Sequence, residues 1–245
     1  MSVRKRTLTI EEEKCLLHLP EKPNGYGILL VGDRNHYIQG ETSLWTQHPT
    51  RKNLLEGLME AGYTIFYCDQ GGAHWGNDRL SVVLGRLKSL VMKTEILNQH
   101  IHILAEGMGA LLVLRLMTDP SVSVRSAVFI NPCFYLDKQL EEEKTNRFFY
   151  KKMIQEIKSS YGIEEKEIED VCKKLGEICE KLDPSIPIRL IQAVYQAPYS
   201  MEKQTRFFIK EKKQTQKDLE TTFYLPGKTI EQFLQPILTF FVKYE

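Results

Sequence analysis

The sequence contains no long apolar run. Its longest hydrophobic stretches are far shorter than the roughly 20 residues that a membrane-spanning helix needs. The first residues are basic, but Glu11, Glu12 and Glu13 follow them in place of the apolar core of a secretory signal. We therefore expect a protein without a membrane partner that is made and kept in the cytoplasm.

The sequence also lacks an excess of charge of one sign, and its cysteines do not form an obvious paired set. The formal net charge is only +1, so no overall field favours nucleic acid or anionic lipid. The five cysteines are an odd number and show no metal-binding spacing. Cys68 and Cys133 lie in apolar runs, where reduced cysteine behaves as a small hydrophobe. These observations indicate a reducing compartment and predict no nucleic acid, no cofactor and no metal.

What the sequence does contain is an alternation of short β-type runs and longer helical patterns. This alternation predicts an α/β fold with a mainly parallel central sheet and helices on both faces. The predicted strands are residues 7–10 and 15–19 as an opening hairpin, then 27–31, 63–68, 100–104, 126–130, 186–194 and 222–225. The predicted helices are residues 51–61, about 77–93, 110–117, 201–219 and 231–244.

Residues 134–182 are rich in Lys and Glu at helical spacing and contain no strand pattern. We predict that they form a helical lid, or cap insertion, over the sheet. The core domain would then consist of residues 1–133 and 183–245.

The predicted strand 100–104 runs into Ala105-Glu106-Gly107-Met108-Gly109-Ala110 and then into an apolar helix. The small residues at 105, 109 and 110 suit a strained turn in which strand and helix pass closely. This arrangement resembles the nucleophile elbow of the α/β-hydrolase fold superfamily, which presents its nucleophile at the centre of such a turn. Here the centre is Gly107, which has no side chain to attack a substrate.

The order of the other segments resembles the same superfamily over nearly the whole chain. The strand 27–31 precedes a loop at the place of the oxyanion loop, and residues 69–77 resemble the Gly-rich loop after the next strand. By this resemblance Gln196 stands where the acid of the triad usually stands, and Lys228 where the histidine stands. No histidine follows His102 in the sequence. The resemblance therefore implies that the Ser-His-Asp triad is absent, a loss that lowers turnover on the order of 10⁶-fold.

Seven residues are candidates for ligand binding near the former active-site pocket: Asp33, Arg34, His36, His74, Trp75, Glu106 and Met108. The first three follow the oxyanion-loop strand and could select a polar or anionic ligand, or form an ordinary solvated loop. His74 and Trp75 could contact a ligand, or could fix their loop as buried residues. Glu106 could be a relocated acid or base acting with His74, or could stabilise the start of a helix.

Other patterns have simpler explanations. His100 and His102 would share one face of a strand, but no further metal ligands accompany them at suitable spacing. The lysine-rich residues 203–217 are explained by a solvated amphipathic helix. Four lid residues could cover the pocket or form the lid's own packing: Phe148, Phe149, Tyr150 and Met153.

We expect a non-catalytic α/β-hydrolase-like protein, a pseudoenzyme with a degenerate nucleophile elbow, that binds a small molecule or a protein partner near the former active site. One alternative is a hydrolase-like enzyme with a non-standard acid-base site around His74 and Glu106, with Asp78 or Asp33. Another is a structural or interaction protein that uses the lid surface. The closing helix and the edge strands could support a homodimer.

Overall fold

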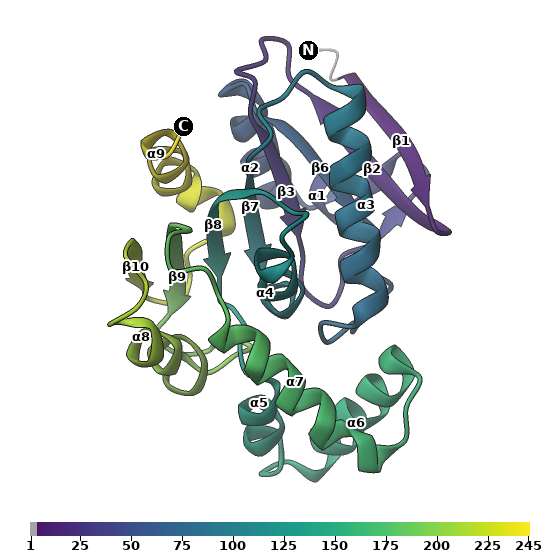
Figure 1. Ribbon diagram of the computed structural model, residues 1–245, viewed down its shortest axis with the longest axis vertical. Coiled ribbons are helices and arrows are strands. Elements are labelled where there is room, and N and C mark those ends of the chain that lie inside the picture. Colours follow the sequence, from purple (N-terminus) through teal and green to yellow (C-terminus); the bar gives the residue numbers. More distant parts are fainter. Residues whose placement is uncertain (1–3) are drawn as a thin grey trace.

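The computed structural model describes residues 4–245, so the first three residues of the predicted core segment 1–133 lie outside it. Its centre is an eight-stranded sheet in the order β1-β2-β6-β3-β7-β8-β9-β10 (Figure 1). From β6 to β10 all neighbours pair in parallel, whereas β2 pairs antiparallel with both β1 and β6. The strands are β1 (Arg4–Ile10), β2 (Glu13–Leu19), β3 (Gly27–Val31), β6 (Thr64–Cys68), β7 (Ile101–Glu106), β8 (Val124–Ile130), β9 (Ile188–Ala193) and β10 (Leu219–Tyr224). The predicted mainly parallel sheet is confirmed.

The central strands are apolar throughout because both of their faces are buried. Along β3, Leu29 and Val31 belong to the core on one face of the sheet, while Ile28 and Leu30 belong to the core on the other. The first core contains residues of α3 (Asp78–Thr94), α4 (Gly109–Thr118) and α8 (Phe207–Lys212). The second contains residues of α1 (Leu44–Gln47), α2 (Pro49–Glu60) and α9 (Leu234–Lys243). Helices thus cover both faces, as predicted (Figure 1).

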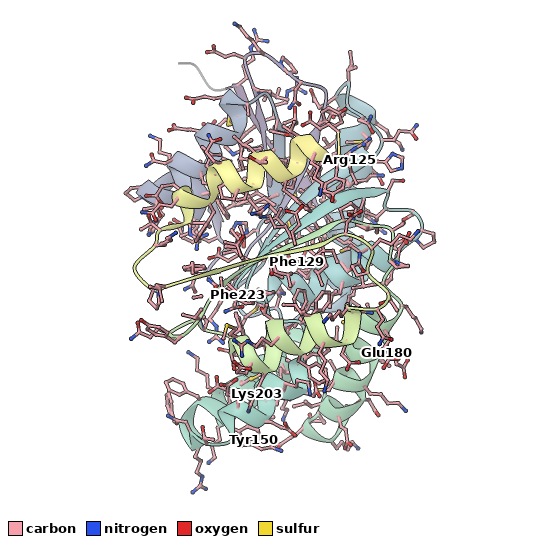
Figure 2. All side chains as sticks on the ribbon, turned by 90° about the vertical axis from the view of Figure 1, so that its left-hand side faces the viewer. Arg125, Phe129, Tyr150, Glu180, Lys203 and Phe223 are labelled. Carbon is pink, nitrogen blue, oxygen red and sulfur yellow. The ribbon has the colours of Figure 1, made fainter. Side chains whose placement is uncertain are left out.

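Residues 134–182, called here the helical segment, lie beyond the end of the sheet to which the arrows of β7 and β8 point (Figure 1). The segment contains α5 (Leu136–Glu143), α6 (Arg147–Tyr161), the short 3₁₀ turn η1 (Glu165–Glu167) and α7 (Ile168–Glu180). Figure 2 shows Arg125 at the start of β8, Phe129 nearer the middle of the molecule and Tyr150 in the helical segment. A third apolar core joins the segment to Trp75, Met108 and Leu111. Its division from the rest of the chain as a separate lid stays a prediction.

Capping residues set the ends of two of these helices. The Asn77 side chain accepts a hydrogen bond from the Leu80 N–H at the start of α3, as its sequence position predicts. Asn146 caps α6 in the same way, and α6 ends at Gly162 in the left-handed conformation.

The predicted helix 201–219 is wrong over its last third. A π-helical turn, η2 (Met201–Arg206), leads into α8, which ends at Lys212. Leu219 already belongs to β10, where it pairs with Ile188 of β9. Sheet pairing at the edge therefore overrides a charged sequence whose local pattern is helical.

The remaining elements are short. The loop after β3 contains a small hairpin of β4 (Ile38–Gln39) and β5 (Thr42–Ser43), which the sequence pattern does not indicate. The predicted closing helix begins as a 3₁₀ turn, η3 (Ile230–Phe233), before α9. None of the helices between residues 4 and 245 is long and apolar enough to cross a membrane.

Candidate functional site

Gly107 lies at the bend where β7 ends and α4 begins, and its φ of +56° is in the left-handed region that favours glycine. Its N–H donates to the Ile130 carbonyl (3.0 Å), and its carbonyl accepts from the Cys133 N–H (2.9 Å). At the next glycine, a Cβ on residue 109 would lie 2.6 Å from the Gly32 carbonyl oxygen. The bend is therefore held against the ends of β3 and β8, and both positions need glycine.

The Asp33 side chain fills the space in front of Gly107. A Cβ at residue 107 would lie 2.2 Å from the Asp33 Cγ and 2.5 Å from each carboxylate oxygen. Oδ1 accepts hydrogen bonds from the Met108 backbone N–H (3.1 Å) and from the Tyr199 hydroxyl (2.7 Å). Burial, to which the Asp33 charge adds, raises the pKa of Tyr199 well above its usual value, so this hydroxyl keeps its proton and donates. A side chain at residue 107 would have to displace a carboxylate that two donors hold.

Glu106 is occupied by an ion pair. The Arg51 guanidinium of α2 donates to both of its carboxylate oxygens, and the longer of the two contacts is 2.7 Å. The guanidinium also lies over the Trp45 ring, 5.0 Å from its centroid. Among residues 4–245, no hydrogen bond joins Glu106 to His74. The acid-base pair expected as an alternative is therefore not brought together by direct contact.

Because this ion pair is mostly buried, Glu106→Gln is expected to lower the free energy of unfolding by about 2 kcal/mol. The substitution leaves the Arg51 charge without its bidentate partner. Urea unfolding followed by circular dichroism measures the change. Glu56→Gln is the matched control, because Glu56 pairs with Lys52 at 3.7 Å on an exposed helix face and is worth less than about 0.5 kcal/mol. Equal effects of the two substitutions would contradict the structural role of Glu106.

His36 and His74 are core residues. The His36 ring packs over Gly32, where a Cβ would lie 2.3 Å from its Cγ, and it accepts a hydrogen bond from the Trp45 indole. Burial lowers the pKa of His36 to about 3. The His74 Nδ1 accepts from the Gly76 N–H (3.1 Å), and burial lowers its pKa to about 4 although Asp33 is close. Both imidazoles are therefore neutral at physiological pH, and both are packed as buried side chains of the core.

A cleft of about 340 Å³ opens beside Asp33. Its walls are formed by the loops after β3, β6 and β9 and by α5 and α6: Asp33, Arg34, Asn35, Trp75, Gln139, Glu143, Phe149, Lys152, Met153, Glu156, Pro198 and Tyr199. Three of the seven sequence candidates, Asp33, Arg34 and Trp75, are among them. The other four, His36, His74, Glu106 and Met108, are not. Met108 is instead fully buried in the core under the helical segment.

One side of the cleft is held together by Glu156 of α6. Its Oε1 accepts from Arg34 (3.0 Å), and its Oε2 accepts from the Trp75 indole N–H (3.0 Å). The Arg34 guanidinium also lies over the Trp75 ring, 5.4 Å from the centroid. This junction joins the helical segment to the loops that follow β3 and β6.

The two other positions that the resemblance assigns to a triad are exposed. Gln196 lies in the loop after β9, with a φ of +57°, and lines a neighbouring groove that it shares with Tyr199. Lys228 lies in the loop after β10. Neither residue is in the wall of the cleft beside Asp33.

Sequence reasoning missed several cleft residues, chiefly Gln139, Glu143 and Tyr199. One signal could have found part of the wall, because Phe149, Met153 and Glu156 recur at helical spacing on one face of α6. Of the four residues considered either as a cover of the pocket or as internal packing, Phe149 and Met153 line the cleft, and Met153 also belongs to the third apolar core. Phe148 is 71% exposed, and Tyr150 packs within the helical segment.

The structure brings together no set of three or more metal-ligating side chains between residues 4 and 245. His102 is a buried residue whose Nδ1 lies 2.8 Å from the Ser126 hydroxyl, whereas His100 is exposed at the strand entrance. The histidine pair considered from the sequence is therefore divided between the core and the surface.

Solved structures share this architecture at low sequence identity. An esterase of Pyrococcus furiosus is 15% identical with a TM-score of 0.68, and the match covers 99% of this chain and 91% of that one. Est1E from Butyrivibrio proteoclasticus is 11% identical with a TM-score of 0.64, and the match covers 98% of each chain. An acylaminoacyl peptidase of Pyrococcus horikoshii is 14% identical with a TM-score of 0.69 over the whole of this chain and 42% of its own.

No protein-family model matches the sequence, and a comparison with curated proteins finds no match. The similarity to solved structures therefore establishes the architecture and leaves the activity open. On the evidence of its sheet order, its glycine bend and these structural neighbours, the chain has the α/β-hydrolase fold.

Proposed function

We propose that this protein is a non-catalytic α/β-hydrolase-like protein, a pseudohydrolase, which binds a small molecule in the cleft between the sheet edge and the helical segment. The bend is formed with glycine at the position from which hydrolases of this fold present their nucleophile.

The position of the Asp33 carboxylate carries the proposal. In this fold the backbone N–H after the nucleophile is one of the donors that stabilise the oxyanion of an acyl intermediate. The corresponding N–H here belongs to Met108, and it donates to Asp33 Oδ1 at 3.1 Å. An internal anion thus uses the donor that an oxyanion would need, and it also fills the place of the nucleophile. Both parts of acyl-transfer catalysis are therefore unavailable to a substrate carbonyl.

The cleft supports the binding role. Its volume of about 340 Å³ is within the range of small-molecule sites. Apolar surfaces of Trp75, Phe149 and Met153 lie beside the polar groups of Asp33 and Tyr199 in its wall. Such a mixture of apolar surface and a few oriented polar groups is typical of ligand sites.

A direct test exposes the protein to a serine-reactive fluorophosphonate probe and to activated acetate and butyrate esters. We expect no labelling by mass spectrometry and no hydrolysis above that of heat-denatured protein. The variant Gly107→Ser is expected to remain unlabelled, because a serine there meets the Asp33 carboxylate and has no histidine to activate it.

Ester turnover that passes through a covalent intermediate would overturn the proposal. Turnover that is lost in both His74→Gln and Glu106→Gln would support a non-standard acid-base enzyme instead. His48→Gln is the matched control for the histidine substitution, because His48 is exposed before α2 and lies outside the cleft.

A further inference from the structure

Two carboxylates of the cleft wall, those of Asp33 and Glu143, have no cation in direct contact within the described part of the chain. Among the described residues, neither Asp33 nor Glu143 forms an ion pair within 4.0 Å. Neutral donors hold them instead: Tyr199 and the Met108 N–H on Asp33, and the Gln139 amide on Glu143 at 3.0 Å.

The two cations of the cleft wall are directed to a different carboxylate. Arg34 lies 3.0 Å from Glu156, and Lys152 lies 3.9 Å from the same oxygen of Glu156. Glu156 therefore has two positive charges within 4.0 Å. Asp33 and Glu143 have none within that distance among the described residues, although the Arg51 charge is close enough to interact with Asp33. The cleft therefore has an ion-paired side at Glu156 and a negative side at Asp33 and Glu143, whose carboxylates form no ion pair with a described residue.

A hydrogen-bond acceptor without a donor lies on the negative side. Gln139 is 3% exposed and lines the cleft, and its Oε1 accepts no hydrogen bond from any residue that the structure describes. The orientation of this amide is determined by chemistry, because its Nε2 donates to the Glu143 carboxylate, which can only accept. Buried acceptors are nearly always satisfied in folded proteins, and this one belongs to a residue of the cleft wall, where a bound ligand can supply the donor.

These observations indicate which kind of ligand group suits the cleft. Positive charge suits it, because two carboxylates without an ion pair line the same cleft, and so do several hydrogen-bond donors, because Asp33 Oδ2, Glu143 and Gln139 Oε1 can all accept. A divalent cation would need at least a third ligand of metal type, and no such set occurs in the described part of the chain. A primary ammonium group meets all of these requirements with its three N–H donors.

We propose that the cleft binds a small primary amine in its protonated form, with the ammonium group between Asp33, Glu143 and Gln139. The apolar part of the ligand lies against Phe149 and Met153 of α6. This inference rests on the proposed function, since it names the class of ligand that the same cleft takes.

Isothermal titration calorimetry with benzylamine tests the inference, with benzyl alcohol and benzoate as neutral and anionic probes of similar shape. We expect saturable millimolar binding of benzylamine at pH 7. Benzyl alcohol and benzoate are expected to bind at least roughly tenfold more weakly than benzylamine, because hydrogen bonds to charged partners are about twice as strong as neutral ones. Calcium chloride is a fourth probe, and we expect no binding of Ca²⁺.

Variants locate the binding. Gln139→Leu and Glu143→Gln are each expected to weaken benzylamine binding about tenfold, whereas Gln139→Glu, which adds a negative acceptor, is expected to preserve or strengthen it. Gln214→Leu, at an exposed position outside the cleft, is the matched control and is expected to change nothing.

Any one of four outcomes would overturn the amine inference: benzoate binds more tightly than benzylamine, Ca²⁺ binds, Gln139→Leu leaves benzylamine binding intact, or benzylamine does not bind. None of these outcomes affects the ester and fluorophosphonate test, which decides separately whether the protein is catalytic. Conversely, ester turnover together with Gln139-dependent benzylamine binding would contradict the non-catalytic role and leave the amine site in place.

Discussion

Gly107→Ala is expected to lower the free energy of unfolding by about 3 kcal/mol, of which roughly 1 kcal/mol is the strain of placing an alanine in the left-handed region. The rest arises because the new methyl group would lie 2.2 Å from the Asp33 Cγ. The carboxylate must then move and release the hydrogen bonds from Met108 and Tyr199. Urea unfolding at pH 7.5 measures the change.

A double-mutant cycle separates the two contributions. Asp33→Ala removes the atoms that the methyl group would strike and is itself expected to lower stability by about 1 to 2 kcal/mol, because two donors lose their acceptor. The double variant Gly107→Ala/Asp33→Ala is expected to be about 2 kcal/mol more stable than the sum of the single effects predicts. Gly85→Ala is the matched glycine control, since a Cβ there meets nothing within 4 Å. Additive effects at 33 and 107 would contradict the placement of the carboxylate in front of the bend.

Stability is expected to fall steeply between pH 6.5 and pH 5. Burial lowers the pKa of four histidines, to about 4 for His18 and His74 and to about 3 for His36 and His102. In the unfolded chain these groups bind protons near pH 6.5, so below that pH the unfolded state gains protons that the folded state does not take up. Each of these histidines then lowers the free energy of unfolding by roughly 1 to 2 kcal/mol at pH 5. Together, the four remove a large part of a typical stability of about 5 to 15 kcal/mol.

Urea unfolding midpoints at several pH values from 7.5 to 5.0 measure this loss, in a window mostly above the titration of carboxylates. His102→Gln is expected to reduce the pH dependence by about a quarter, one histidine of the four that contribute. The exposed His100, two residues earlier in the chain, supplies the control His100→Gln, for which the wild-type pH dependence is expected. A stability that stays level across the window would contradict neutral burial of these imidazoles.

Much of the fold follows from local sequence patterns. The strand 27–31 has the predicted bounds, because an apolar run of that length between turns has few alternatives to a buried strand. The Asn77 cap is likewise a local interaction between neighbouring residues. The end of the predicted helix 201–219 could not be found in this way, because its last residue pairs with a strand some 30 positions away.

The candidate site likewise has a part that local sequence patterns predict and a part that they do not. Asp33, Arg34 and Trp75 follow predicted strands of one parallel sheet, so their meeting at one edge could be anticipated. The sequence also indicates that residue 107 has no side chain, but not that Asp33 replaces it, since this depends on how the loop after β3 closes onto the bend. Gln139 and Tyr199 reach the cleft through packing of the helical segment and the loop after β9, which no local pattern specifies.

The carboxylate in front of the glycine bend also limits how this protein can evolve. A serine gained at residue 107 would arrive in a space already filled, so that mutation alone yields a less stable chain with no new reactivity. A serine at this place would first require the loss of the Asp33 carboxylate, which also accepts a hydrogen bond from Tyr199 in the cleft wall. Two substitutions, at residues 33 and 107, would therefore have to occur together before a nucleophilic side chain could occupy the bend.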